Sequence, residues 1–180
     1  MYITIPKKSK VDNVEKIKIT SDESVYKLNE VQAIKDAAQE HLIFIGLDNA
    51  NNLRAVNFLS IGTSKSINVD SKDIVRTALI TNSDKVIFVH NHPSNSLLPS
   101  NFDKHFTDKV CKMLKVFNIE LLDHIIVTEE SYSSMHKQGN INRNYEDKDT
   151  HIIDNTILIE ENMQLKNKIR RLERNIELER

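Results

Sequence analysis

The run KVIFVH at residues 85–90 constrains the fold most, because nearly every position in it is apolar. A strand with one face in water would alternate apolar with polar residues. A continuous apolar run is instead typical of a strand that is covered on both faces. The sequence therefore predicts a central β-strand at 85–90.

Helical spacing of apolar residues predicts three helices, at 20–41, 71–81 and 100–117. The first opens with Thr20 and Glu23 at capping-box spacing, the second with a serine cap, and the third with Ser100 as its N-cap. The helix positions expected to face the core are Val25, Leu28, Val31, Ile34, Ala38, Ile74, Ala78, Leu79, Phe102, Phe106, Val110, Met113, Leu114 and Phe117.

The remaining short apolar runs predict strands. Residues 42–48 and 53–62 flank the turn-forming NANN and predict a hairpin, while 119–127 predicts a further strand and 132–135 a short one. Strands that alternate with helices after an early hairpin favour an α/β sandwich with a mixed β-sheet flanked by helices.

We expect four segments along the chain. An N-terminal arm at 1–20 precedes the α/β domain at 21–137, and a polar linker at 138–152 leads to a C-terminal helix extension at 153–180.

The composition excludes several classes of protein. No stretch reaches the roughly 18 apolar residues of a membrane span, and the N-terminus lacks a secretion signal, so a cytoplasmic location is expected. The single cysteine, Cys111, lies among apolar residues and is expected to be a buried thiol. The net charge of -1 predicts no whole-chain attraction to nucleic acid.

Polar residues gather where the central strand ends. His90 and His92 alternate with Asn91, so in an extended chain both imidazoles point to one side. If Ser100 caps the third helix, Asp103 lies in its first turn and can face the strand end. Two histidines and one carboxylate are the ligand set of a catalytic zinc site, and one cysteine in the chain rules out the usual structural kind.

The wider pattern carries a family resemblance. HNHPS at 90–94, followed at family spacing by Ser100 and Asp103, resembles the His-x-His-x7-Ser-x2-Asp signature of the JAMM (MPN+/JAB) metalloenzymes. The segments SKDIVRTAL, VIFVHNHPS and IELLDHIIV are similar to those of bacterial RadC-like proteins, a branch once tied to DNA repair. The resemblance covers roughly 24–136.

The resemblance implies a JAB/MPN-like sandwich, similar to that of the cytidine deaminases. It implies that His90, His92 and Asp103 bind Zn²⁺, and that Ser100 holds the metal-bound water or the developing oxyanion. Zinc activates water and polarises a carbonyl, so the implied activity is hydrolysis of a peptide or isopeptide bond.

The resemblance also implies a general-base glutamate on the hairpin strand that ends at Gly62. Phe58 stands at the corresponding position, with Asn57 beside it, and no Asp or Glu occurs from 49 to 69. We therefore expect this glutamate to be absent and Phe58 to line the floor of the metal site. Hydrolysis by metal alone, a base from elsewhere and zinc binding without turnover all stay open. The candidate bases elsewhere are Asp48, Asp70 and Glu40.

Two residues of the strand at 119–127 bear on the same site. His124 is interpreted as a satisfied core histidine, with a place beside the metal as the alternative. Asp123 is a candidate for orienting a ligand histidine.

Two function classes compete with the zinc hydrolase. One is a catalytically weak or inactive zinc-binding interaction module, suggested by the expected lack of a glutamate. The other is a DNA-associated factor, suggested by the RadC resemblance and by the basic stretch KNKIRRLER at 166–174.

The C-terminal segment 155–180 has a heptad pattern, with leucines at d positions and Asn or Ile at a positions. This pattern predicts a parallel homodimer, with a helix folded back on its own domain as the alternative. The predicted dimer interface is Leu158, Asn162, Leu165, Ile169, Leu172 and Ile176.

Overall fold

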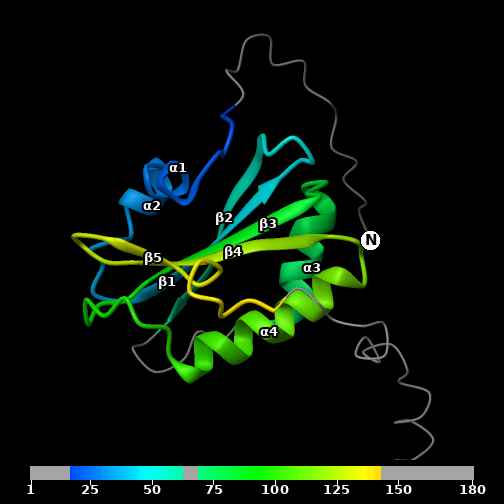
Figure 1. Cartoon of the computed structure of the whole chain (residues 1–180). Helices are drawn as coiled ribbons and strands as arrows, with labels where there is room; N and C mark the ends of the chain where they lie inside the picture. The colour runs from blue at the N-terminus through cyan, green and yellow to red at the C-terminus, as the bar shows by residue number, and fades with distance from the viewer. Residues whose placement is uncertain (1–16, 63–68, 143–180) are drawn as a thin grey trace, which may run out of the picture.

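The computed structural model describes residues 17–62 and 69–142 as an α/β sandwich around one mixed sheet (Figure 1). The sheet has the strand order β2-β1-β3-β4-β5. The elements are α1 (Asp22–Tyr26), α2 (Asn29–Gln32), β1 (Glu40–Leu47), β2 (Leu53–Gly62), α3 (Ser71–Ile80), β3 (Lys85–Asn91), α4 (Asn101–Lys115), β4 (Glu120–Val127) and β5 (Tyr132–Ser134).

The strand directions confirm the predicted mixed sheet. β1 pairs antiparallel with both β2 and β3, so the early hairpin is present. β3 and β4 are parallel, and the crossover between them is α4, because parallel neighbours need a long connection. β5 returns antiparallel to β4.

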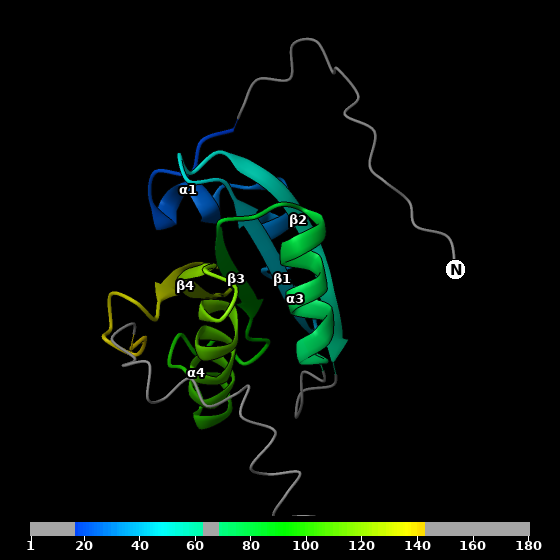
Figure 2. The same cartoon turned by 90° about the vertical axis from the view of Figure 1, so that its right-hand side faces the viewer.

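Helices cover both faces of the sheet (Figures 1 and 2). On one face α3 and α4 pack on Val86 and Phe88 of β3, and on the other α1 and α2 pack on Ile87 and Val89. Alternate residues of β3 therefore enter two different cores, which confirms the prediction of a doubly covered central strand. The face under α3 and α4 is called the α4 face below, and the other the α1 face.

The segment predicted as one helix at 20–41 is instead two short helices and a turn. Ser21 and Ser24 form the capping box of α1, not Thr20 and Glu23. Leu28 has extended backbone angles (φ -62, ψ 138) and starts α2, so the helical path breaks there. The apolar spacing predicted burial correctly at Val25, Leu28, Val31 and Ile34, but not at Ala38, which is exposed.

Other helix predictions were right in position and wrong in detail. Ser100 caps α4 as predicted, whereas α3 is capped by Asp70 and not by its serine. Leu79, Phe102 and Phe117 were expected in the core and are 45–53% exposed. They lie near the ends of their helices or, like Leu79 beside Ala78, one step round from the buried stripe.

Cys111 is buried, as expected, and Ile141 packs against the core on the α4 face. Residues 1–16 and 143–180 lie outside the described residues, so the predicted linker, C-terminal coiled coil and dimer interface stay predictions. Over 17–62 and 69–142, no helix is long and apolar enough to cross a membrane.

Candidate metal centre

The end of β3 and the start of α4 bring His90, His92 and Asp103 together. His90 lies on the α4 face, paired across the sheet with Leu42 of β1, and His92 follows the last strand residue. Asp103 lies in the first turn of α4. One ligand atom from each of the three residues lies within 4.8 Å of the others, so the cluster predicted from the sequence is present and could hold a metal ion.

The spacing of the ligand atoms fits zinc on two of its three sides. Asp103 Oδ1 lies 3.4 Å from His90 Nε2, and Asp103 Oδ2 lies 3.5 Å from His92 Nε2. Ligands about 2.1 Å from a tetrahedral zinc lie about 3.4 Å apart. Each separation matches this value, and the two run to different oxygens of Asp103. The third, between the two Nε2 atoms, is shorter at 2.7 Å.

The hydrogen bonds of the two rings turn both Nε2 atoms toward each other and toward the Asp103 carboxylate. His92 Nδ1 lies 2.6 Å from the carbonyl oxygen of Ser96, which can only accept, so the ring hydrogen sits on Nδ1. His90 Nδ1 can likewise donate to His124 Nε2 at 2.8 Å. With both Nδ1 hydrogens directed away, the two Nε2 atoms, which lie 2.7 Å apart beside the Asp103 carboxylate, need a proton or a cation between them. This donor set fits a zinc ion.

A chain of hydrogen bonds holds His90 from behind. His124 Nδ1 donates to Thr107 Oγ1 at 2.6 Å, and that hydroxyl donates to the carbonyl oxygen of Asp103 at 2.6 Å. Complete burial, followed by the charge of His90, holds the pKa of His124 well below its usual value, so the ring stays neutral. His124 is therefore the satisfied core histidine that was expected, and it also contacts a residue of the site.

Asp103 stays ionised although it is buried. Burial alone raises its pKa. When the Nε2 atoms carry protons, hydrogen bonds from His90 and His92 and the charge of His90 outweigh burial and hold the pKa of Asp103 well below its ordinary value. Ser100 adds its backbone N–H at 2.7 Å and its hydroxyl at 2.6 Å, both to Oδ2. The Ser100 hydroxyl thus orients Asp103, while its predicted contact with water or an oxyanion stays a prediction.

The prediction that Phe58 lines the metal site is wrong. Phe58 pairs with Ile43, and Ile43 with Val89, so Phe58 lies on the α1 face while His90 lies on the α4 face. A bulge at Leu59 shifts the register just before the strand end. Phe58 is 52% exposed, as suits a residue on the edge strand β2.

The carboxylate beside the site comes from β1. Glu40 is two residues before Leu42, the partner of His90, so it lies on the α4 face at the same end of the sheet. Burial lowers the pKa of His92, but the hydrogen bond and charge of Asp103, the Ser96 carbonyl and the charge of Glu40 together raise it. Glu40 was one of three candidate bases, and its spacing from the strand LIFIGLD was the signal that could have singled it out.

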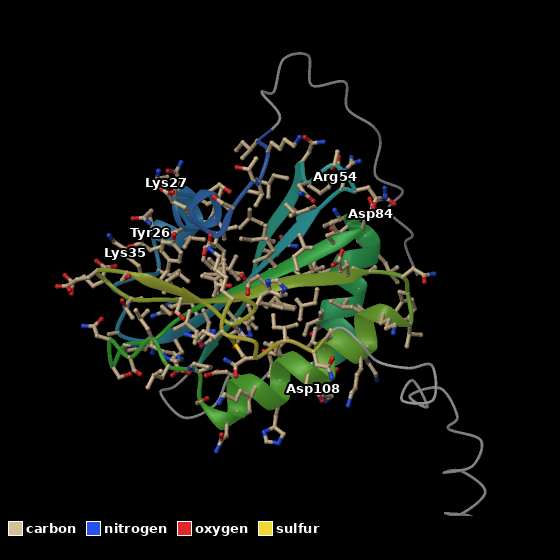
Figure 3. All side chains as sticks on the ribbon, in the orientation of Figure 1. Tyr26, Lys27, Lys35, Arg54, Asp84 and Asp108 are labelled. Atoms are coloured by element: carbon tan, nitrogen blue, oxygen red, sulfur yellow. The ribbon has the colours of Figure 1, made fainter. Side chains whose placement is uncertain are left out.

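The other two candidate bases have different tasks. Asp48 follows the far end of β1, and its carboxylate accepts four hydrogen bonds from Ala50 and Asn52 within its turn. Figure 3 shows Arg54, its ion-pair partner, far from Lys35, which lines a cleft of about 100 Å³ with His92. Asp70 caps α3 through a 2.9 Å bond from the Lys72 N–H.

Asp123 does not orient a ligand histidine. It pairs with Ile87, so its side chain lies on the α1 face. There it accepts hydrogen bonds from the Ser134 hydroxyl and the His136 N–H. The expectation failed because Asp123 and His124 are neighbours on a strand and point to opposite faces.

Comparison with known proteins matches the whole described domain. The family model of the RadC-like JAB domain matches residues 19–140. UPF0758 proteins are 34% identical over 126 residues in Methanococcoides burtonii (70% of this chain, 55% of the relative) and 40% over 101 residues in Pseudoalteromonas translucida (56% and 45%). The relative in Pelodictyon phaeoclathratiforme is 33% identical over 106 residues (59% and 48%). The chain spans about half the length of the curated relatives it matches.

Proposed function

The chain belongs to the RadC-like JAB domain family, and on that premise we propose that it is a zinc-dependent hydrolase of peptide or isopeptide bonds. The observation that carries the proposal is the convergence of His90, His92 and Asp103, with both Nε2 atoms directed at one point.

Each residue of the centre has a defined task in the proposed reaction. Zinc held by this ligand set would lower the pKa of a water and polarise the substrate carbonyl. Glu40 accepts a proton from the attacking water and returns it to the leaving amine, because it is half-buried and lies at the same strand end as His92. Ser100 keeps Asp103 ionised and oriented.

The position of Glu40 bears on the competing interpretation. A zinc-binding module without turnover was suggested by the expected lack of a glutamate on β2. Glu40 supplies a carboxylate from the neighbouring strand, which supports the hydrolase over the inactive module. DNA association and dimerisation depend on 151–180, outside the described residues. We expect a dimer that becomes monomeric in analytical ultracentrifugation when 151–180 are deleted.

Replacement of the proposed base tests the function. The full chain, loaded with zinc, should cleave peptide or isopeptide-linked substrates, and Glu40→Gln should lower kcat by about 10²–10⁴-fold while zinc stays bound. Asp48→Asn is the matched control, since it removes a carboxylate from the other end of β1 and should leave kcat unchanged. Full activity in Glu40→Gln would mean that the base lies elsewhere. A zinc-loaded wild type that cleaves neither substrate class would favour the inactive module.

A further inference from the structure

We propose that Asn91, the residue between the two histidines, is a positioning residue that holds Glu40 in place relative to the metal ligands. The inference rests on the proposed function, because it assigns the distance between base and metal to one side chain. Asn91 lies on the α1 face with no exposed surface, so it touches neither metal nor substrate.

The side-chain amide of Asn91 forms hydrogen bonds with the backbone on both sides of Glu40. Its Oδ1 accepts a hydrogen bond from the His41 N–H at 2.7 Å, and its Nδ2 donates to the carbonyl oxygen of Gln39 at 2.9 Å. A further bond from Nδ2 reaches the Ala37 carbonyl oxygen at 3.0 Å. Both N–H donors of the Asn91 amide and its carbonyl oxygen thus bond the backbone of residues 37–41, the segment that contains Glu40.

These hydrogen bonds lie where the backbone pairing between β1 and β3 ends. The backbone pairing between β1 and β3 ends at Leu42 and His90, so no pair of backbone groups joins the strands at His41. The side chain of Asn91 makes the next connection instead. Its own backbone is paired with Val127 of β4, which fixes the end of β3 from the other side.

The consequence is a rigid frame that contains both parts of the centre. His90 and His92 are joined covalently to Asn91, and Glu40 is joined to it through the hydrogen bonds of its two neighbours. A misplacement of about 1 Å can lower a catalysed rate about 10²-fold, so a loose Glu40 would be costly even with zinc in place.

A double-mutant cycle separates positioning from plain stability. Asn91→Ala should lower kcat about 10²-fold with less change in KM, and should cost less than about threefold on a Glu40→Gln background, since both changes act through one group. An equal loss on both backgrounds would overturn the proposal. Asn52→Ala is the matched control, because Asn52 bonds Asp48 in the turn at the other end of β1 and should leave kcat unchanged.

Two readouts do not depend on turnover, so they separate this proposal from the proposed function. Amide hydrogen exchange of the full chain should show His41 protected in the wild type and in Asn52→Ala, and exposed in Asn91→Ala. Zinc affinity in Asn91→Ala should stay within about tenfold of the wild type, because Asn91 bonds neither ligand ring. Unchanged protection of the His41 amide in Asn91→Ala would overturn the proposed positioning role of Asn91, whether or not a substrate is found. Loss of zinc with protection lost would overturn it too, by making Asn91 a support of the ligands.

Discussion

Asp103, which is buried, and Asp123, which is half-buried, lie on opposite faces of the sheet, and their pKa values are shifted in opposite directions. Around Asp103, hydrogen bonds from two imidazoles outweigh burial and lower the pKa. Around Asp123, burial outweighs the Ser134 hydroxyl and the backbone N–H groups, so the pKa is raised. The donors around Asp123 therefore do not offset burial, whereas imidazoles that can be protonated or bind a cation favour the charged form of Asp103.

The residues around Asp103 and those around Asp123 also differ in their hydrogen bonds. Around Asp123, the Ser134 hydroxyl and the N–H groups of His136 and His124 all donate to the one carboxylate. At Asp103 the neighbouring imidazoles direct two Nε2 atoms at one another and at the carboxylate, with room between them for a proton or a cation. Burial and polarity alone do not identify a binding site. The convergence of two Nε2 atoms and a carboxylate on one point does indicate one.

The largest expected effect is on stability and concerns the hydrogen bonds around Asp123. Asp123→Ala leaves the Ser134 hydroxyl and the His136 and His124 N–H groups without their acceptor, so it should lower the free energy of unfolding by about 3 kcal/mol, near 1 kcal/mol for each bond. Urea denaturation measures the loss. Zinc stoichiometry of the folded variant should be unchanged, and zinc loss would show that the two clusters are coupled.

The next effect is on zinc affinity and concerns the hydrogen bond between His90 and His124. His124→Phe keeps the ring volume but removes the acceptor of His90 Nδ1, and should weaken zinc affinity about 10–100-fold. Competition with a zinc chelator of known affinity measures it. Phe106→Leu changes an aromatic neighbour of His124 without touching its hydrogen bonds, so that variant should bind zinc normally. Equal affinities in His124→Phe and the wild type would mean that His90 needs no partner.

The pH dependence of zinc binding is a smaller effect of the same cluster. The pKa of His92 is raised above its ordinary 6.5, chiefly because the bond to Asp103 overcomes burial, and zinc must displace that proton. Affinity should be level at high pH and fall about tenfold per pH unit below the pKa of His92, with the fall beginning above pH 6.5. Affinity that stays level down to pH 6 would contradict the raised pKa.

Local patterns predicted most of the fold. The continuous apolar run of β3, the hairpin and the capped α4 depend on neighbouring residues, so they could be read from the sequence. The single helix expected at 20–41 was wrong because apolar spacing gives burial but not continuity, and Leu28 keeps its burial while its backbone is extended.

The site was predictable where its residues are close in sequence. His90, His92, Ser100 and Asp103 lie within one strand–loop–helix unit, and their spacing indicated that they meet. Glu40 comes from another strand, and its place depends on the register of β1 against β3. The bulge at Leu59 and the alternation along β2 and β4 likewise decide the faces of Phe58 and Asp123, which distant pairing sets.

The metal content of the purified full chain tests the central claim most directly. Wild-type protein made with ample zinc should hold about one zinc ion per chain, and His92→Ala and Asp103→Ala should lose it. Asp123→Ala, the matched carboxylate on the other face, should keep it. Wild-type protein without zinc under these conditions, or zinc retained in both ligand variants, would contradict a metal centre built from His90, His92 and Asp103.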